Sequence, residues 1–230
     1  MSEGTHGPGR QRGRLSRERV LRAAVAVADA GGLGSLTLRS LARDLGVKPM
    51  SVYHHVANKD EILDGIVDLV FAEIVLPDPR GEWRPEVRRR AASVRDVLSR
   101  HRWAIGLLES RTTPGPATLR QHDAMLGTLR AAGFSTALTA HAYALLDSYV
   151  YGFALQEASL PFEGPDGPAE VAEPILGLML AGGYGHMVDM ARDHYLQPGY
   201  DFGDEFDFGL DLVLDGLAAR LAAEAGTEGP

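Results

Sequence analysis

The sequence predicts an all-α fold of about ten helices, with an N-terminal three-helix helix-turn-helix domain followed by a larger C-terminal helical bundle. Apolar residues recur every three to four positions through most of the 230 residues, which is the period of a helix, and no segment shows convincing two-residue alternation. Glycine and proline separate the periodic segments, as helix ends require. Hydrophobic residues make up 45% of the chain, which is enough to fill a core.

Changes in composition divide the chain into four parts. Residues 1–15 are glycine, proline, arginine and polar residues without periodicity, so we expect a disordered basic arm there. Residues 16–60 would form the helix-turn-helix domain, and residues 61–76 a connecting helix. The sequence PDPRG at 77–81 interrupts the helical pattern, and we therefore place the second domain at residues 77–230.

Capping residues mark the first two helices. Ser16 can cap the first, and Gly31-Gly32 would end it. Thr37 can cap a short second helix. Gly46 then stands where a left-handed residue usually closes a helix.

The next two helices follow at once. Pro49 suits the first turn of a third helix, which we expect to reach about Val56. Asn58 and Glu61 have the spacing of a capping box and would open the fourth.

Glycine and capping residues also mark helix ends in the C-terminal part. Gly133 would stop one helix, and Ser135 would cap a long one that is apolar on nearly every side. A further helix is expected across 171–194, and a last one after the loop at 197–203.

Charge is distributed unevenly along the chain. The net charge is −8, yet residues 1–60 carry ten Lys or Arg against five Asp or Glu, whereas the remainder carries thirteen against twenty-six. A basic head that meets phosphates and an acidic body that avoids them would produce this pattern. A passive basic arm is the alternative.

The second helix of the helix-turn-helix has a distinct outer side. Because neighbours on a helix are ~100° apart, Val52 and Val56 define an inner face, and Met50 and His54 lie almost opposite, with Ser51 beside them. The exposed side contains no acid, and phosphates and base edges tolerate such a surface.

The segment SLTLRSLARDLGVKPMSVYHHVANK at 35–59 resembles the DNA-binding signature of the TetR family, most clearly in Leu45-Gly46-Val47, Tyr53, His55-Val56 and Asn58-Lys59. The resemblance implies double-stranded DNA as a partner. It implies that phosphates are held by Thr37, Tyr53, His55 and Lys59, and that Lys48, Pro49, Met50, Ser51 and His54 face bases. Plain packing of Tyr53 against the first helix, and solvated histidines, are the alternatives.

The second half is similar, more loosely, to the tetracycline-repressor branch of that family, at 101–108, 126–134 and 149–157. This similarity implies an effector-binding domain and a homodimer formed through helices at about Thr136–Ala158 and Asp204–Ala223. It also places Leu107 or Leu108 where the branch has a magnesium-binding histidine. We therefore predict no metal site and no response to tetracycline–Mg²⁺.

A mostly apolar effector pocket is expected among the middle helices. Plain core packing is the alternative at each position. The candidate lining is Trp103, Leu107, His122, Met125, Leu129, Tyr149 and Phe153.

Signatures of catalysis are missing from the sequence. It has no cysteine, no glycine-rich phosphate loop and no HExxH pair. We therefore expect neither an enzyme nor a cofactor.

Taken together, these observations predict a cytoplasmic repressor, without a membrane span, that binds a palindromic operator as a homodimer. A small apolar or aromatic effector would release it. The alternatives are a ligand-independent DNA-binding regulator and a small-molecule-binding protein with a vestigial DNA module.

Overall fold

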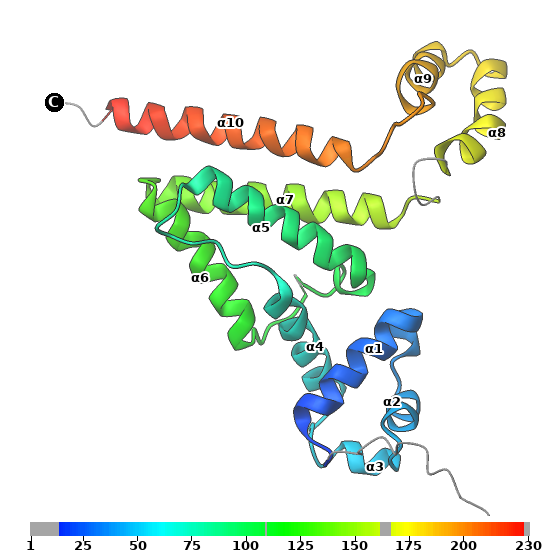
Figure 1. The fold of residues 1–230 in the computed structure, drawn as a ribbon, viewed down its shortest axis with the longest axis vertical. Coiled ribbons are helices and arrows are strands. Elements are labelled where there is room, and N and C mark those ends of the chain that lie inside the picture. Colours follow the sequence, from blue (N-terminus) through cyan, green and yellow to red (C-terminus); the bar gives the residue numbers. More distant parts are fainter. Residues whose placement is uncertain (1–13, 109, 162–166, 228–230) are drawn as a thin grey trace, which may run out of the picture.

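The computed structural model describes residues 14–108, 110–161 and 167–227, and within these ranges the chain is helical with no strand (Figure 1). The basic arm predicted over residues 1–15 lies outside the described residues apart from Arg14 and Leu15. No helix in the described ranges is both long enough and apolar enough to cross a membrane. The all-α prediction is confirmed.

Four helices form the N-terminal part and lead into the rest of the molecule (Figure 1). They are α1 (Arg17–Ser35), α2 (Leu38–Leu45), α3 (Pro49–Val52) and α4 (Lys59–Glu73).

The C-terminal part contains a bundle in which α10 lies along α7, and an arm formed by α8 and α9 (Figure 1). Its elements are α5 (Trp83–Arg100), the 3₁₀ turn η1 (Arg102–Ala104), α6 (Pro116–Ala131), α7 (Thr136–Ala158), α8 (Gly167–Ala181), α9 (Gly185–Met190), the π turn η2 (Ala191–Tyr195) and α10 (Asp204–Thr227).

The predicted caps are present. The side chains of Ser16, Thr37 and Asn58 accept hydrogen bonds from backbone N–H groups in the first turns of α1, α2 and α4. Gly46 closes α2 in the left-handed region, at φ 67°. Ser135 caps α7 in the same way as the others. These local signals therefore located the helix starts correctly.

Two predicted helix ends differ from the structure. The first helix leaves helical geometry at Gly31 and Gly32 as expected, but helical turns resume to Ser35, whose hydroxyl donates to the carbonyls of Val27 and Gly32. The third helix stops at Val52, and a turn replaces the predicted helix up to Val56.

The helix predicted across 171–194 was wrong as a single element. Gly183 has φ 73°, outside the helical region, and the chain turns there between α8 and α9.

Two hydrophobic cores share α4. Ile62 and Ile66, in its first half, belong to the core built with α1, α2 and α3. The second half of α4 belongs to the core of the C-terminal bundle, which it enters with Val67, Val70 and Phe71. One rigid helix therefore joins the two parts of the molecule.

Close packing between α1 and α4 depends on Gly65. A Cβ at this position would lie 2.6 and 2.7 Å from the two terminal methyl carbons of Leu21. We expect Gly65→Ala to lower the free energy of unfolding, because overpacking costs about 1–3 kcal/mol and exceeds the gain of about 1 kcal/mol in helix propensity. Urea denaturation measures the change. Gly177→Ala in α8 meets no atom within 4 Å and is the control; equal stability of both variants would contradict the packing argument.

Candidate nucleic-acid interface and effector domain

The segment from Lys48 to Val56 is exposed on one side and anchored on the other. Val52 and Val56 are 0% and 2% exposed and pack into the N-terminal core. Opposite them Met50 is 68% exposed and Tyr53 42%. The inner face predicted from the sequence is thus the buried one, and α3 lies at the end of the molecule farthest from α10 (Figure 1).

The other side chains predicted to contact DNA belong to the same part of the fold. Lys48, Pro49 and His54 are exposed, and Ser51 and His55 are half-buried. Thr37 and Lys59 are both exposed, Thr37 before the first turn of α2 and Lys59 within the first turn of α4. Their placement shows a surface made of ammonium, imidazole, hydroxyl, thioether and phenol groups. The chain has no carboxylate between Lys48 and Lys59.

Hydrogen bonds fix the loop that follows α3. The side chain of Glu61 accepts from the backbone N–H of Ala57 at 2.6 Å and from Arg17 Nε at 2.9 Å. The bond from Ala57, followed by that from Arg17, holds the pKa of Glu61 below its ordinary value. The carboxylate is therefore charged near neutral pH and ties α1 to the start of α4.

The seven residues predicted to contact an effector lie in several places. Met125 and Leu129 are buried in the C-terminal core, while Tyr149 and Phe153 lie within an aromatic cluster with Phe202 and Phe206. The other three, apart from that cluster, are Trp103 beside α1, the half-buried Leu107, and His122 against Phe71.

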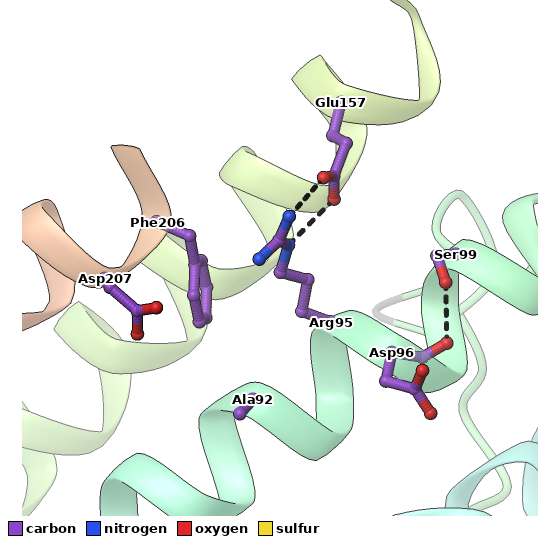
Figure 2. Close-up of a pocket in the computed structure, with 7 residues that line it drawn as sticks. All are labelled: Ala92, Arg95, Asp96, Ser99, Glu157, Phe206 and Asp207. Atoms are coloured by element: carbon purple, nitrogen blue, oxygen red, sulfur yellow. Dashed lines mark hydrogen bonds and ion pairs between the residues drawn. The ribbon is translucent and has the colours of Figure 1, made fainter. Parts of the chain in front are cut away.

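A pocket of about 270 Å³ lies between α5, α7 and α10 (Figure 2). None of the seven residues predicted to contact an effector lines it. The guanidinium of Arg95 occupies one side, 5.3 Å from the ring centre of Phe153 and 5.1 Å from that of Phe206. Its Nε donates to Glu157 at 3.0 Å and its Nη2 at 2.5 Å. These bonds raise the pKa of Arg95. Asp96 and Asp207 also line the pocket, which is therefore unfavourable for anions.

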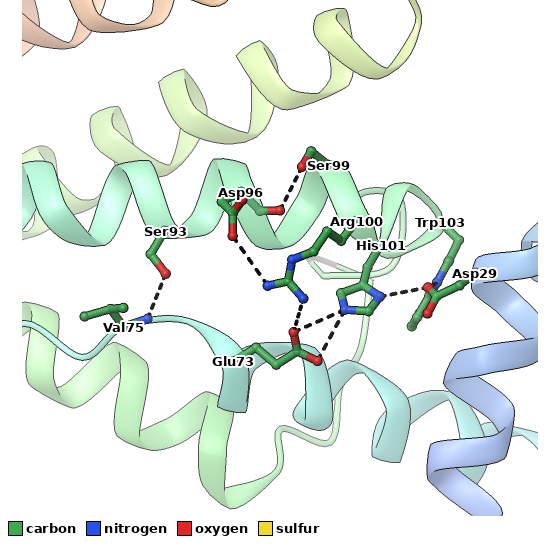
Figure 3. Close-up of polar contacts among 9 residues, drawn as sticks. All are labelled: Asp29, Glu73, Val75, Ser93, Asp96, Ser99, Arg100, His101 and Trp103. Atoms are coloured by element: carbon green, nitrogen blue, oxygen red, sulfur yellow. Dashed lines mark hydrogen bonds and ion pairs between the residues drawn. The ribbon is translucent and has the colours of Figure 1, made fainter.

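His101 connects three elements at the joint between the two parts (Figure 3). It is 6% exposed, with Nδ1 2.7 Å from Asp29 of α1 and Nε2 3.3 Å from both carboxylate oxygens of Glu73 of α4. Trp103 Nε1 donates to the same oxygen of Asp29 at 2.6 Å, and Arg100 donates to Glu73 at 2.5 Å. Both contacts of the imidazole are hydrogen bonds when both ring nitrogens carry protons.

Polar side chains also tie α4 to α6 and the segment before it. Asp68 accepts from the backbone N–H and hydroxyl of Thr118 at 2.8 and 3.0 Å. Gln121 donates to the carbonyls of Phe71 and Ile74 at the end of α4, at 3.3 and 2.5 Å.

Near the start of α4, Arg111 bonds to Asp64 at 2.5 Å and to Asp60 at 3.3 Å. Sequence reasoning missed all these contacts because no local pattern relates residues about 50 positions apart.

Known proteins share both parts of this arrangement. Residues 20–66 match the sequence profile of bacterial regulatory proteins of the tetR family, and residues 76–221 match that of the tetracyclin repressor-like C-terminal domain. The chain belongs to the TetR family of transcriptional repressors. The HTH-type transcriptional repressor DrrR1 of Streptomyces coeruleorubidus is 33% identical over 94% of this chain and 82% of the relative.

Solved structures of TetR-family members have the same fold. ActR of Streptomyces coelicolor in complex with actinorhodin is 28% identical, with a TM-score of 0.74 over 90% of this chain and 99% of that chain. BioQ with its double-stranded DNA operator is 25% identical, with a TM-score of 0.62 and the same coverage.

The carboxylate of Glu73 gives the domain joint a defined pH dependence. Burial favours a higher pKa, but hydrogen bonds from Arg100 and His101 outweigh burial, and the pKa lies below its ordinary value of 4.5. A lowered pKa means that the stabilisation is complete above pH 4.5 and is lost as the pH falls through the native value.

We expect Glu73→Gln to lower the melting temperature at pH 7 by a modest amount, since a partly exposed ion pair contributes less than about 1 kcal/mol. The difference from the unmodified protein should shrink as the pH falls below 4.5. Thermal scans from pH 7 to pH 3 measure it, with Glu18→Gln, in an exposed pair with Arg22, as the control. A difference that grows in acid would contradict the assignment.

Proposed function

We propose that this TetR-family repressor is a homodimer that places two copies of α3 in successive major grooves of a palindromic operator and is released by a small molecule. The exposed outer side of α3, held by Val52 and Val56, is the observation that carries the proposal. Two such helices ~34–36 Å apart would match one turn of B-DNA. The operator complex of BioQ supports the same use of the fold.

The roles of the individual side chains follow from their chemistry. Pro49 and Met50 offer apolar contact to thymine methyl groups, and Ser51 and His54 offer hydrogen bonds to base edges. The residues that would hold phosphates, and so fix the register, are Thr37, Tyr53, His55 and Lys59. Lys48, at the N-terminal end of α3, would face bases with the other four.

Exposed apolar side chains on α7 and α10 support the homodimer. Leu145 and Leu155 on α7 are 47% and 56% exposed, and Phe208 and Leu212 on α10 are 67% and 59% exposed. The two helices lie together, so one such face from each protomer would form a four-helix interface.

The proposed functions of the two parts of the chain correspond to the two hydrophobic cores. We assign DNA binding to residues 16–60, the connection to residues 61–76, and effector binding and dimerisation to residues 77–230. ActR binds actinorhodin, which supports a small-molecule effector here. The effector would bind among the aromatic and apolar side chains of the C-terminal domain and displace α4, and a coupling of ~1–3 kcal/mol would weaken operator binding five- to hundredfold.

The base-reading assignment predicts a large loss of specific affinity in Ser51→Ala/His54→Ala. Each base contact contributes about 1–3 kcal/mol, so binding to a duplex selected by the unmodified protein should weaken by a factor of ten or more. Electrophoretic mobility shifts measure it. Unchanged affinity would remove the assignment. Lys59→Ala, which removes a proposed phosphate contact, should weaken binding to all duplexes and reduce its salt dependence, whereas Arg192→Ala, an equal change of charge in η2 of the C-terminal part, should do neither.

The dimer interface predicts that Leu212→Glu gives monomers. Burying an unpaired carboxylate between protomers should raise the dimer dissociation constant by roughly a hundredfold or more. Operator binding should fall with it, because one α3 reads only half of a palindrome. Leu119→Glu on α6, where the leucine is 56% exposed, is the matched control. Sedimentation velocity shows the assembly state, and a dimeric Leu212→Glu variant would contradict the interface.

A further inference from the structure

The C-terminal core contains an arginine that is almost completely buried. Arg90, on α5, is 2% exposed. Its Nη1 contacts Asp147 of α7 at 3.4 Å, while neither Nε nor Nη2 has a hydrogen-bond partner among the described residues. The positive charge is therefore balanced by one long contact, and two donors inside the core are unsatisfied.

The unsatisfied nitrogens are the two that form one edge of the guanidinium. Nε–H and the adjacent Nη2–H point in the same direction, and their spacing fits the two oxygens of a carboxylate. Arg95, five residues further along α5, shows the same edge filled, because its Nε and Nη2 bond to Glu157. Arg90 thus presents the arrangement that Arg95 uses for a carboxylate, but no carboxylate of the described residues bonds to that edge.

Aromatic groups are connected to the Arg90–Asp147 pair. Tyr143, one turn before Asp147 on α7, has a pKa that burial and Asp147 raise and Arg90 lowers, with a net increase, so the phenol is neutral. Its hydroxyl lies 2.7 Å from Nδ1 of His122. The His122 ring lies 5.5 Å from the ring of Tyr143 and 5.7 Å from that of Phe71 on α4. Such surroundings suit a flat aromatic body.

A second unsatisfied group lies on α6, which packs against α5. Gln121 is 2% exposed, and its Oε1 has no hydrogen-bond partner among the described residues, while its amide nitrogen holds the last carbonyls of α4. A hydroxyl group on a ligand would be a suitable donor to this oxygen.

We propose that Arg90 is the anchor of the effector and that the effector is an aromatic carboxylic acid. The proposal rests on the effector-controlled function above and refines it, since an apolar molecule alone would leave Arg90 unsatisfied. Binding that rearranges Gln121 or His122 acts directly on Phe71 and Ile74, and so on α4.

The test uses three aromatic acids of increasing size, benzoate, 2-naphthoate and anthraquinone-2-carboxylate, each paired with its neutral amide. Calorimetry on the full chain should show that at least one acid binds and that its amide binds tenfold more weakly or not at all. The same acid should reduce operator binding. An acid and amide of equal affinity, or no binding by any acid, would overturn the proposal.

Variants then locate the anion. Arg90→Lys keeps the charge but removes the edge, and should weaken binding of the acid by roughly ten- to a hundredfold. Arg95→Lys, whose edge is already occupied by Glu157, should leave it unchanged. Because loss of Arg90 strands Asp147, the double variant Arg90→Met/Asp147→Leu gives a folded apolar replacement, in which the preference for acid over amide should vanish. A preference that persists in both Arg90 variants would overturn the assignment.

Operator binding without ligand separates the two proposals. If the protein binds its operator but none of the acids, the proposed role of Arg90 is overturned and the repressor function stands. Acid binding that depends on Arg90 in a protein that binds no duplex supports the anchor and removes the repressor function on which it rests.

Discussion

The structure depends on one helix that belongs to two cores. α4 buries Ile62 and Ile66 against the DNA-binding helices, and Val70 and Phe71 against the C-terminal bundle. Protein cores are close-packed and resist continuous deformation. A change in how α4 sits in the bundle therefore displaces the N-terminal core as a unit, and α3 with it. Apolar burial thus gives the proposed communication between the two parts a mechanical route.

Polar contacts decide how α4 is oriented. Arg111 bonds to its first turns, Asp68 in its middle accepts hydrogen bonds from Thr118, and Gln121 donates to its last carbonyls. Glu73 then meets Arg100 and His101. Such contacts are directional, whereas apolar burial is not. The hydrophobic surfaces place α4 in both cores. The hydrogen bonds then select one orientation of the helix among those that the apolar contacts permit.

The same distinction explains what the sequence could predict. Caps at Thr37 and Asn58, the left-handed Gly46, and the buried side of α3 all follow from residues within one or two turns, and each agrees with the structure. The link from His101 to Asp29 spans 72 positions, and that from Gln121 to Ile74 spans 47. No periodicity encodes such pairs. The break at Gly183 did have a local signal, the Gly182-Gly183 pair, but the prediction followed the apolar residues further away on both sides and continued the helix through it.

A buried arginine is informative because the fold alone gives it little reason to be there. Replacing a buried ion pair by apolar residues is often neutral or stabilising, and each unsatisfied buried donor costs about 1–3 kcal/mol. A ligand shifts a conformational equilibrium only by its difference in affinity for the two states. The free energy recovered when an anion satisfies Arg90 is of the same order as the ~1–3 kcal/mol of coupling that control of DNA binding requires. In the proposed mechanism, the unsatisfied edge of Arg90 is therefore the source of the energy that would move α4.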